Sequence, residues 1–353
     1  MPHQEAKRDT RNATRRLKEN MNLSKTMFAA SLAGNRLFLI LLPTEACNFR
    51  CIYCYEKREN GRMEAPVLQG VKNLLTRRAA NLEVLRIAWF GGEPLLARDI
   101  IEEVHRHVQG LLEEHSQIRF SADITTNAYL LSREVFEDLL KCGVTQYQIS
   151  FDGPREWHDR KCMLPGGKGT FTRIWDHVTA LRDVPGEFKV ILRIHVDEDN
   201  AEAIPDFITR CRDVFGGDPR FQFFIRALSR LGGSRDHQIR ALEGGLQDKR
   251  IEALRKLASS MGLNEYCSQT PFTLCYAVQG NCFVVRADGR INKCTVSLEH
   301  PENQMGRLHE NGTMTLNRER MLVWMRGLFS GDSEVLRCQL IGFPDPCAEA
   351  HDV

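Results

Sequence analysis

Short runs of apolar and β-branched residues alternate with longer helical periods between residue 36 and about residue 226. This alternation is typical of βα units whose strands form a parallel sheet. The expected strands are Arg36–Leu42, Val84–Phe90, Ile118–Thr125, Gln146–Phe151, Lys189–Val196 and Phe221–Ile225. The expected helices cover about 64–80, 97–115, 131–141, 170–183, 200–213 and 241–261. The pattern predicts an α/β fold with six strand–helix units, although periodicity alone does not show whether the sheet closes.

Three cysteines, Cys47, Cys51 and Cys54, follow the first expected strand with the spacing Cys-x3-Cys-x2-Cys. Soft thiolates suit iron–sulfur chemistry, and three of them can hold three irons of a [4Fe–4S] cube and leave the fourth iron open. The loop stands at the carboxyl end of a buried strand, where α/β barrels carry their chemistry. Zinc sites usually combine a short cysteine pair with a second pair. The triplet therefore favours an iron–sulfur site over a zinc loop or three unrelated thiols.

This cysteine triplet resembles the signature of the radical S-adenosylmethionine (SAM) superfamily. The resemblance implies a partial, TIM-like (β/α)6 barrel in which the open iron is chelated by the amino and carboxylate groups of SAM. It also implies an enzyme in which one electron cleaves SAM to a 5′-deoxyadenosyl radical that abstracts a substrate hydrogen. Tyr53 matches the aromatic residue that lies against the adenine in relatives. An external electron donor such as flavodoxin or ferredoxin is a further implied partner.

Polar motifs at the ends of the next strands extend this resemblance. Gly91-Gly92-Glu93 matches the family motif that holds the methionyl amine, since glycine permits close approach and a carboxylate accepts hydrogen bonds from ammonium. An ordinary glycine turn is the alternative for this motif. Family positions that contact the ribose and methionyl moiety correspond here to Asn127, Ser150 and Asp152, although such residues also occur in plain turns and caps. Arg193 could pair with the methionyl carboxylate, and a surface salt bridge is its alternative.

A second group of cysteines lies near the carboxyl end of the sequence. Cys275 and Cys282 lead into an expected β-hairpin with Asp288-Gly289 at its turn and Cys294 at its far end. This arrangement resembles the opening of a SPASM domain, an extension that carries auxiliary iron–sulfur clusters. The segments 152–159 and 166–171 resemble the same branch of the superfamily, which acts on peptides and proteins. We therefore expect a SPASM-like or twitch-like domain with one auxiliary cluster.

The last cysteines depart from the full SPASM pattern. Cys338 and Cys347 occupy cysteine positions of that pattern, but Ile341 and His351 stand where two more cysteines are usual. Two thiolates are too few for the usual four-thiolate cube, so a second auxiliary cluster is predicted to be absent. The fourth ligand of the first auxiliary cluster could be His351, Cys338 or Cys347, or that iron could stay open. Four other cysteines are assigned no role, as small core residues: Cys142, Cys162, Cys211 and Cys267.

The expected organisation is a basic arm at 1–30, a radical SAM barrel at 31–235, a linker helix at 236–265 and a SPASM-like domain at 266–353. The net charge of +2 implies no strong attraction to nucleic acid or membranes. The sequence shows no apolar stretch of membrane-spanning length and no signal-peptide pattern. Thiols that bind metal suit a reducing compartment, so a cytoplasmic protein is predicted.

The favoured function is maturation of a ribosomally made precursor peptide by an oxidative cross-link, which could be a thioether, carbon–carbon or carbon–oxygen bond. Sulfatase maturation to formylglycine is less favoured, because Thr295 stands where those relatives carry an aspartate. Oxidation of a sugar, nucleotide or small metabolite is a further alternative. An iron–sulfur sensor without enzymatic activity is the least favoured interpretation, because it has no use for the SAM-binding motifs.

Overall fold

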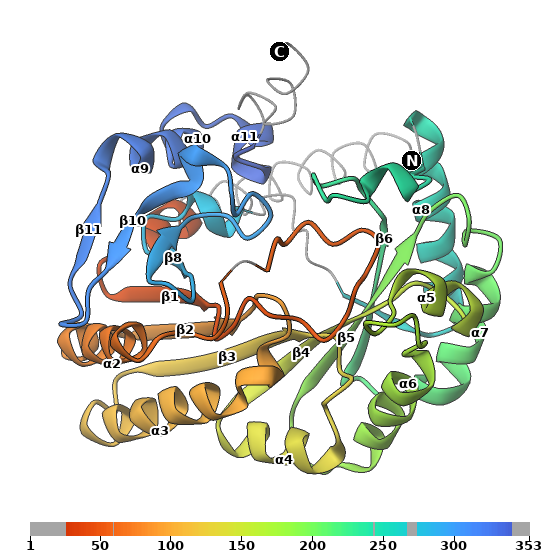
Figure 1. Cartoon of the computed structure of the whole chain (residues 1–353), viewed down its shortest axis with the longest axis horizontal. Helices are drawn as coiled ribbons and strands as arrows, with labels where there is room; N and C mark the ends of the chain where they lie inside the picture. The colour runs from red at the N-terminus through yellow and green to blue at the C-terminus, as the bar shows by residue number, and fades with distance from the viewer. Residues whose placement is uncertain (1–25, 59, 243, 267–273, 341–353) are drawn as a thin grey trace, which may run out of the picture.

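A single eleven-stranded sheet runs through the computed structural model, which describes residues 26–340 apart from 59, 243 and 267–273 (Figure 1). Its central strands are parallel and follow the order of the sequence. They are β1 (Arg36–Leu41), β2 (Val84–Trp89), β3 (Arg119–Thr126), β4 (Val144–Phe151), β5 (Lys189–Val196) and β6 (Phe221–Ala227). The six strand–helix units of an α/β fold are thereby confirmed.

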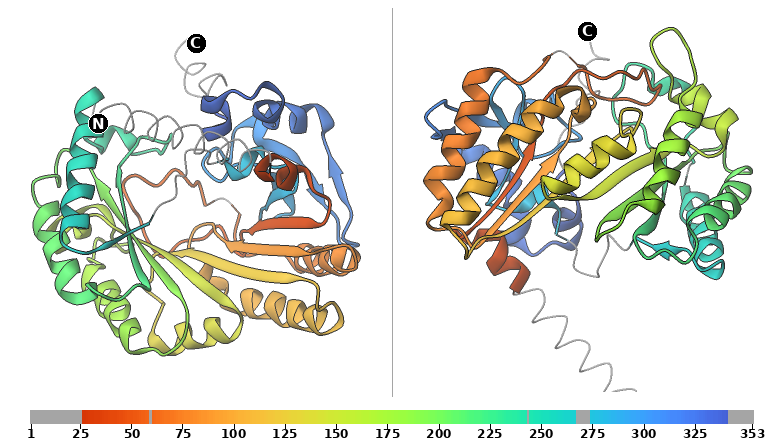
Figure 2. Two further views of the ribbon diagram at one scale, coloured as in Figure 1. Left: turned by 180° about the vertical axis from the view of Figure 1, so that it is seen from behind. Right: turned by 90° about the horizontal axis from the view of Figure 1, so that it is seen from below.

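Helices follow these strands and lie along the outer side of the curved sheet (Figures 1 and 2). They are α2 (Ala65–Ala79), α3 (Arg98–Glu114), α4 (Arg133–Lys141), α6 (Phe171–Ala180), α7 (Ile204–Phe215) and α8 (Gly244–Ser260). The short helix α5 (Arg155–Lys161) was not expected. Helix α7 begins later than the predicted residue 200, because Asp197 and Asn200 exchange side-chain and backbone hydrogen bonds of 2.9 and 3.1 Å in a turn before it. Pro205 then fits the first turn of the helix.

The outer face of the sheet is apolar and packs on the helices. Tyr147 of β4 stacks at a tilt against Phe136 of α4, with ring centroids 4.5 Å apart. On the opposite face of β4, Gln146, Gln148 and Ser150 are only half-buried. Because strand side chains alternate between two faces, this sheet presents a polar concave face beside the carboxyl ends of its strands.

The residues after α8 extend the same sheet. The strands are β7 (Asn264–Glu265), β8 (Cys282–Val285), β9 (Arg290–Asn292), β10 (Gln304–Leu308) and β11 (Met314–Leu316). Strand β8 pairs in parallel with β1, so that Phe38 lies opposite Cys282. Strands β8 and β9 form the expected hairpin, whose turn contains Gly289 at φ +86°. The auxiliary-cysteine region is therefore joined directly to the first barrel strand.

Three short helices complete the described carboxyl region: α9 (Arg318–Trp324), α10 (Arg326–Ser330) and α11 (Ser333–Arg337). Most of the predicted basic arm, together with Cys267, Cys347 and His351, lies outside the described residues. Within the described ranges, no helix is both long and apolar enough to cross a membrane. The proposed domain boundaries stay predictions.

Candidate active site

The loop between β1 and α2 carries Cys47, Cys51 and Cys54, all of which are half-buried free thiols. Burial raises the pKa of Cys47 to about 12 and that of Cys54 to about 11. These thiols are therefore protonated until a metal supplies compensating positive charge. Among the described residues, no three His, Cys, Asp or Glu side chains converge on a single metal ion. A cube does not require such convergence, because each of the three thiolates binds a different iron.

Gly91 and Gly92 are required by the cysteine loop itself. A Cβ on Gly92 would lie 2.1 Å from the Ala46 carbonyl oxygen. Gly91 has φ +90°, and a Cβ there would lie 2.8 Å from the Thr44 carbonyl oxygen. The sequence interpretation expected these glycines to admit a ligand, whereas the structure shows that they admit the chain's own backbone just before Cys47.

Glu93 is fully buried and braces the end of β3. Its carboxylate accepts hydrogen bonds from the Leu95 amide at 3.0 Å, the Thr126 hydroxyl at 2.7 Å and the Asn127 amide at 2.7 Å. Burial raises its pKa to about 6, although these three donors oppose the rise. The structure thus gives Glu93 a structural role beside the loop, and its contact with the methionyl amine stays a prediction.

Asn127 and Arg193 approach the same region from β3 and β5. The Asn127 side-chain Nδ2 donates to Asn48 Oδ1 at 2.8 Å and lies 4.0 Å from Cys47 Sγ. Arg193 stands opposite Ser150 in the β4–β5 register. The buried Nε of Arg193 has no hydrogen-bond partner among the described residues. A buried guanidinium nitrogen without a partner suits a carboxylate ligand, as the predicted contact with SAM requires, and no ion pair of Arg193 is seen in the described part of the chain.

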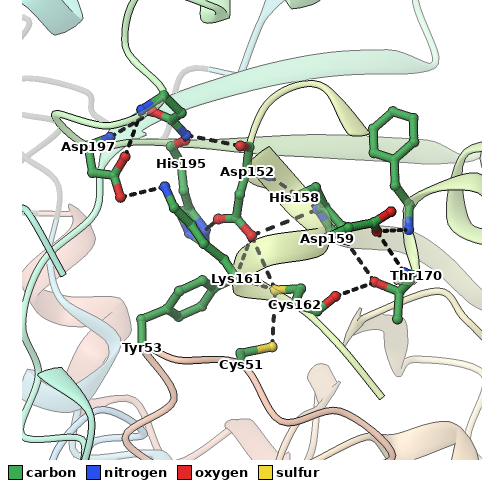
Figure 3. A network of polar contacts seen from close by, with 12 residues as sticks. Cys51, Tyr53, Asp152, His158, Asp159, Lys161, Cys162, Thr170, His195 and Asp197 are labelled. Carbon is green, nitrogen blue, oxygen red and sulfur yellow. Dashed lines mark hydrogen bonds and ion pairs between the residues drawn. The ribbon is translucent and has the colours of Figure 1, made fainter. Parts of the chain in front are cut away.

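Asp152 lies at the centre of a buried polar network, shown in Figure 3. Its carboxylate lies 3.1 Å from each of the Tyr53 hydroxyl, Cys162 Sγ and His195 Nδ1. Burial acts to raise the pKa of Asp152, but the hydrogen bond and positive potential from His195 outweigh it and hold the pKa below its usual value. Asp152 is fully buried and accepts a hydrogen bond from the Tyr53 hydroxyl; contact of Asp152 with the ribose stays a prediction.

Cys162 is the residue that the sequence interpretation missed. It was assigned no role, but its Sγ lies 3.0 Å from Cys51 Sγ and 3.0 Å from the Tyr53 hydroxyl. No local pattern could indicate this contact, because 111 sequence positions separate Cys51 and Cys162.

The second cysteine group lies around the β8–β9 hairpin. Burial raises the pKa of Cys275 to about 11, and nearby Cys294 and Cys338 raise it further. Cys282 is fully buried on β8. Burial raises its pKa, and the nearby Cys275 raises it further. Cys275 thus interacts electrostatically with Cys282, Cys294 and Cys338, and its amide donates to the Leu336 carbonyl oxygen at 2.9 Å.

A buried cation accompanies this second group. Lys293 is fully buried, and its ammonium donates to the carbonyl oxygens of Gln279 and Cys282. Burial lowers its pKa to about 8. No ion pair with a carboxylate is seen for Lys293 in the described part of the chain. Its charge would be offset by thiolates bound to a cluster, so the donor set fits an anionic iron–sulfur centre.

Tyr55 interacts electrostatically with both cysteine groups. Burial raises the pKa of Tyr55 well above its usual value, and both Cys54 and Cys294 contribute to the rise.

Thr295, which follows Cys294, is held by Tyr276 through a 2.7 Å contact between their hydroxyl oxygens. The residue after Cys294 is therefore a threonine, and its neutral hydroxyl already contacts the Tyr276 hydroxyl.

Comparison with known proteins identifies the domain that this geometry builds. Residues 41–211 match the model of the Radical SAM superfamily. The chain is 25% identical over 215 residues to a probable GTP 3′,8-cyclase of Methanocella arvoryzae, covering 60% of this chain and 64% of that protein. It is 28% identical over 134 residues to a PqqA peptide cyclase of Bradyrhizobium diazoefficiens, covering 38% and 33%. The chain thus spans between about a third and two thirds of these relatives.

Solved structures share the fold over a larger part of the chain. Native anSMEcpe with bound AdoMet and Cp18Cys peptide aligns with a TM-score of 0.59 at 18% identity, covering 82% of this chain and 83% of that one. Streptococcus suis SuiB bound to the precursor peptide SuiA aligns with a TM-score of 0.56 at 16% identity, covering 92% and 74%. Residues 41–211 thus form a radical SAM domain, and the enzymes of this superfamily use a [4Fe–4S] cluster and SAM as cofactors.

Proposed function

We propose that this enzyme is a maturase that installs an oxidative cross-link in a ribosomally made precursor peptide. The supporting observation is that Tyr55 interacts electrostatically both with Cys54 of the first group and with Cys294 of the second. Clusters held by the two groups would therefore both lie near this tyrosine. The PqqA peptide cyclase relative and the precursor-bound SuiB structure support a peptide as the substrate.

The residues of this chain would bind and orient the reactants. Cys47, Cys51 and Cys54 would hold the first cluster, and Arg193 would pair with the SAM carboxylate. SAM bound there supplies the hydrogen-abstracting 5′-deoxyadenosyl group, while the protein positions the substrate and excludes water. Because reduced thiols are needed for cluster assembly, we place the enzyme in the cytoplasm.

The second cysteine group would collect the electron that remains after ring closure. For each link, the peptide would lose two hydrogens, one to the deoxyadenosyl group and one as a proton, and the auxiliary centre would supply the acceptor for the remaining electron. We propose Cys275, Cys282, Cys294 and Cys338 as the ligands of that centre, because Cys275 interacts electrostatically with each of the other three. Thr295 and Tyr276 provide no carboxylate base, which disfavours formylglycine formation.

Conversion of a nucleotide is the second candidate. The relative named probable GTP 3′,8-cyclase matches a longer part of this chain than the PqqA relative does. That match reflects the barrel that both kinds of enzyme share. The two cysteine groups do not discriminate between a nucleotide and a peptide as the substrate.

The decisive experiment exposes the anaerobically reconstituted enzyme to SAM and a reductant, with either a candidate precursor peptide or GTP. We expect deoxyadenosine together with a peptide mass lower by about 2 Da per link, since each link removes two hydrogens. The control is Cys47→Ala, which should form no deoxyadenosine. Deoxyadenosine formation with GTP consumed and the peptide mass unchanged would favour the nucleotide reaction.

A further inference from the structure

Cys162 faces Cys51 because the backbones on either side of both residues are joined. The Arg50 amide donates to the Met163 carbonyl oxygen at 2.7 Å, and the Ile52 amide donates to the Lys161 carbonyl oxygen at 3.0 Å. These bonds flank Cys51 in one segment and Cys162 in the other. The 3.0 Å approach of the two sulfurs is thus fixed by paired backbones and does not depend on side-chain rotamers alone.

Cys162 is itself held firmly at the end of α5. Its amide donates to the His158 carbonyl oxygen at 2.8 Å, and its carbonyl oxygen accepts from the Thr170 hydroxyl at 2.6 Å. Only 4% of its surface is exposed. Its sulfur therefore lies in the low-dielectric interior, where a hydrogen bond is electrostatically stronger than in water.

Counting the available protons shows how the network in Figure 3 would be arranged around a bound cluster. Cys51 bound to iron is a thiolate and can only accept. His195 Nδ1 lies against Asp152 Oδ1, and the Tyr53 hydroxyl lies against Asp152 Oδ2, so both can donate to that carboxylate. The proton on Cys162 has two acceptors within reach, Asp152 Oδ2 at 3.1 Å and Cys51 Sγ at 3.0 Å. Because Tyr53 already donates to Oδ2, we assign the Cys162 proton to Cys51.

We propose that Cys162 donates an S–H hydrogen bond to the Cys51 thiolate and thereby raises the reduction potential of the SAM-binding cluster. Hydrogen bonds to cluster sulfurs stabilise the more negative, reduced state and are one of the means by which a protein sets this potential. The other two cysteines have different partners. Cys47 Sγ accepts from the Phe49 amide at 3.3 Å, and Cys54 Sγ lies 3.9 Å from the Glu56 carbonyl oxygen.

Three variants of the reconstituted, full-length enzyme test this role: Cys162→Ala, Cys162→Ser and, as the matched control, Cys211→Ala. Cys211 is also a buried cysteine, and it lies on the buried face of α7. The readouts are the iron content and the midpoint potential of the SAM-binding cluster. The potential is determined by redox titration monitored with electron paramagnetic resonance. Cys162→Ala should retain the parent iron content but show roughly threefold less reduced cluster at a fixed potential, a modest effect because a thiol is a weak donor. Cys162→Ser should recover most of the difference, and Cys211→Ala should match the parent.

The proposal fails if Cys162→Ala has the parent potential, or if Cys211→Ala shifts it equally. Loss of iron from Cys162→Ala and Cys162→Ser but not from Cys211→Ala would also overturn it, because Cys162 would then be an iron ligand. The inference rests on the assignment of Cys47, Cys51 and Cys54 as ligands. Iron content in a Cys51→Ala variant checks that assignment separately from the potential.

Discussion

Arg286 and Glu45 form a buried, two-pronged ion pair that joins β8 to the cysteine loop. Arg286 Nε donates to Glu45 Oε1 at 3.0 Å, and Nη2 donates to Oε2 at 2.6 Å. The same guanidinium lies 2.7 Å from Glu299. Because Glu45 stands two positions before Cys47, this pair fixes the first cysteine group relative to the auxiliary region.

Arg286→Ala should strongly destabilise the protein, because it leaves Glu45 as a buried carboxylate without its main partner. The expected loss is about 3–5 kcal/mol of unfolding free energy, measured by chemical denaturation, with lower iron content after reconstitution. The control is Arg133→Ala, which breaks an exposed ion pair with Glu137 on α4 and should cost about 0.5 kcal/mol or less. Equal losses in the two variants would show that the Arg286 pair does not anchor the loop.

Gly92→Ala should displace the cysteine loop, because the added Cβ would meet the Ala46 carbonyl oxygen at 2.1 Å. We expect a stability loss of about 1–3 kcal/mol and reduced iron retention in a colorimetric assay. Gly110→Ala is the control: it lies exposed in α3 with nothing within 4 Å of an added Cβ. Removing a glycine from a helix should stabilise it by roughly 0.5–1 kcal/mol. Full iron retention in Gly92→Ala would contradict the steric explanation.

His105 should make the protein less stable in mild acid. Its Nε2 accepts a 3.0 Å hydrogen bond from Trp89 Nε1, and burial lowers its pKa from 6.5 to about 4. The unfolded chain therefore binds a proton below pH 6.5 that the folded protein does not bind until about pH 4, so stability is lost as pH falls through this window. Between pH 7.5 and pH 5 this residue should account for a loss of about 2 kcal/mol.

The measurement compares chemical denaturation of the parent and His105→Gln at both pH values. Glutamine can still accept from Trp89 but does not titrate. The variant should lose less stability than the parent on acidification, and identical pH dependence in the two proteins would rule out His105 as the source.

Glu93→Gln tests whether the buried carboxylate also supports SAM binding. The amide of glutamine keeps only one acceptor oxygen. Its NH2 group then faces a hydrogen-bond donor that the carboxylate of Glu93 accepted from, and leaving that buried donor unpaired costs about 1–3 kcal/mol of stability. We expect roughly tenfold weaker SAM binding to the reconstituted protein, which corresponds to about 1.4 kcal/mol, measured by equilibrium dialysis.

Thr126→Val provides the comparison, because it removes one donor to Glu93 and preserves the carboxylate. Its SAM affinity should stay within about threefold of the parent, since Leu95 still donates to the same oxygen. If Glu93→Gln binds SAM as the parent does, Glu93 serves only to hold β3 and the adjoining turn.

The sequence alone determined the features that depend on local periodicity and short spacing. Runs such as Lys189–Val196 identified the strands, and the Asp288-Gly289 pair identified the hairpin before Cys294. The triplet of Cys47, Cys51 and Cys54 was readable because its three sulfurs lie on one loop. These features require only information carried by neighbouring residues.

Tertiary structure decided which distant segments meet. The pairing of β1 with β8, the contact of Cys51 with Cys162 and the Arg286–Glu45 pair all join residues more than 100 positions apart. It also showed that Gly92 makes room for the chain's own backbone and that the buried Glu93 carboxylate accepts three hydrogen bonds. Such contacts depend on sheet curvature and strand register, which are set by the packing of the whole sheet and not by any local pattern.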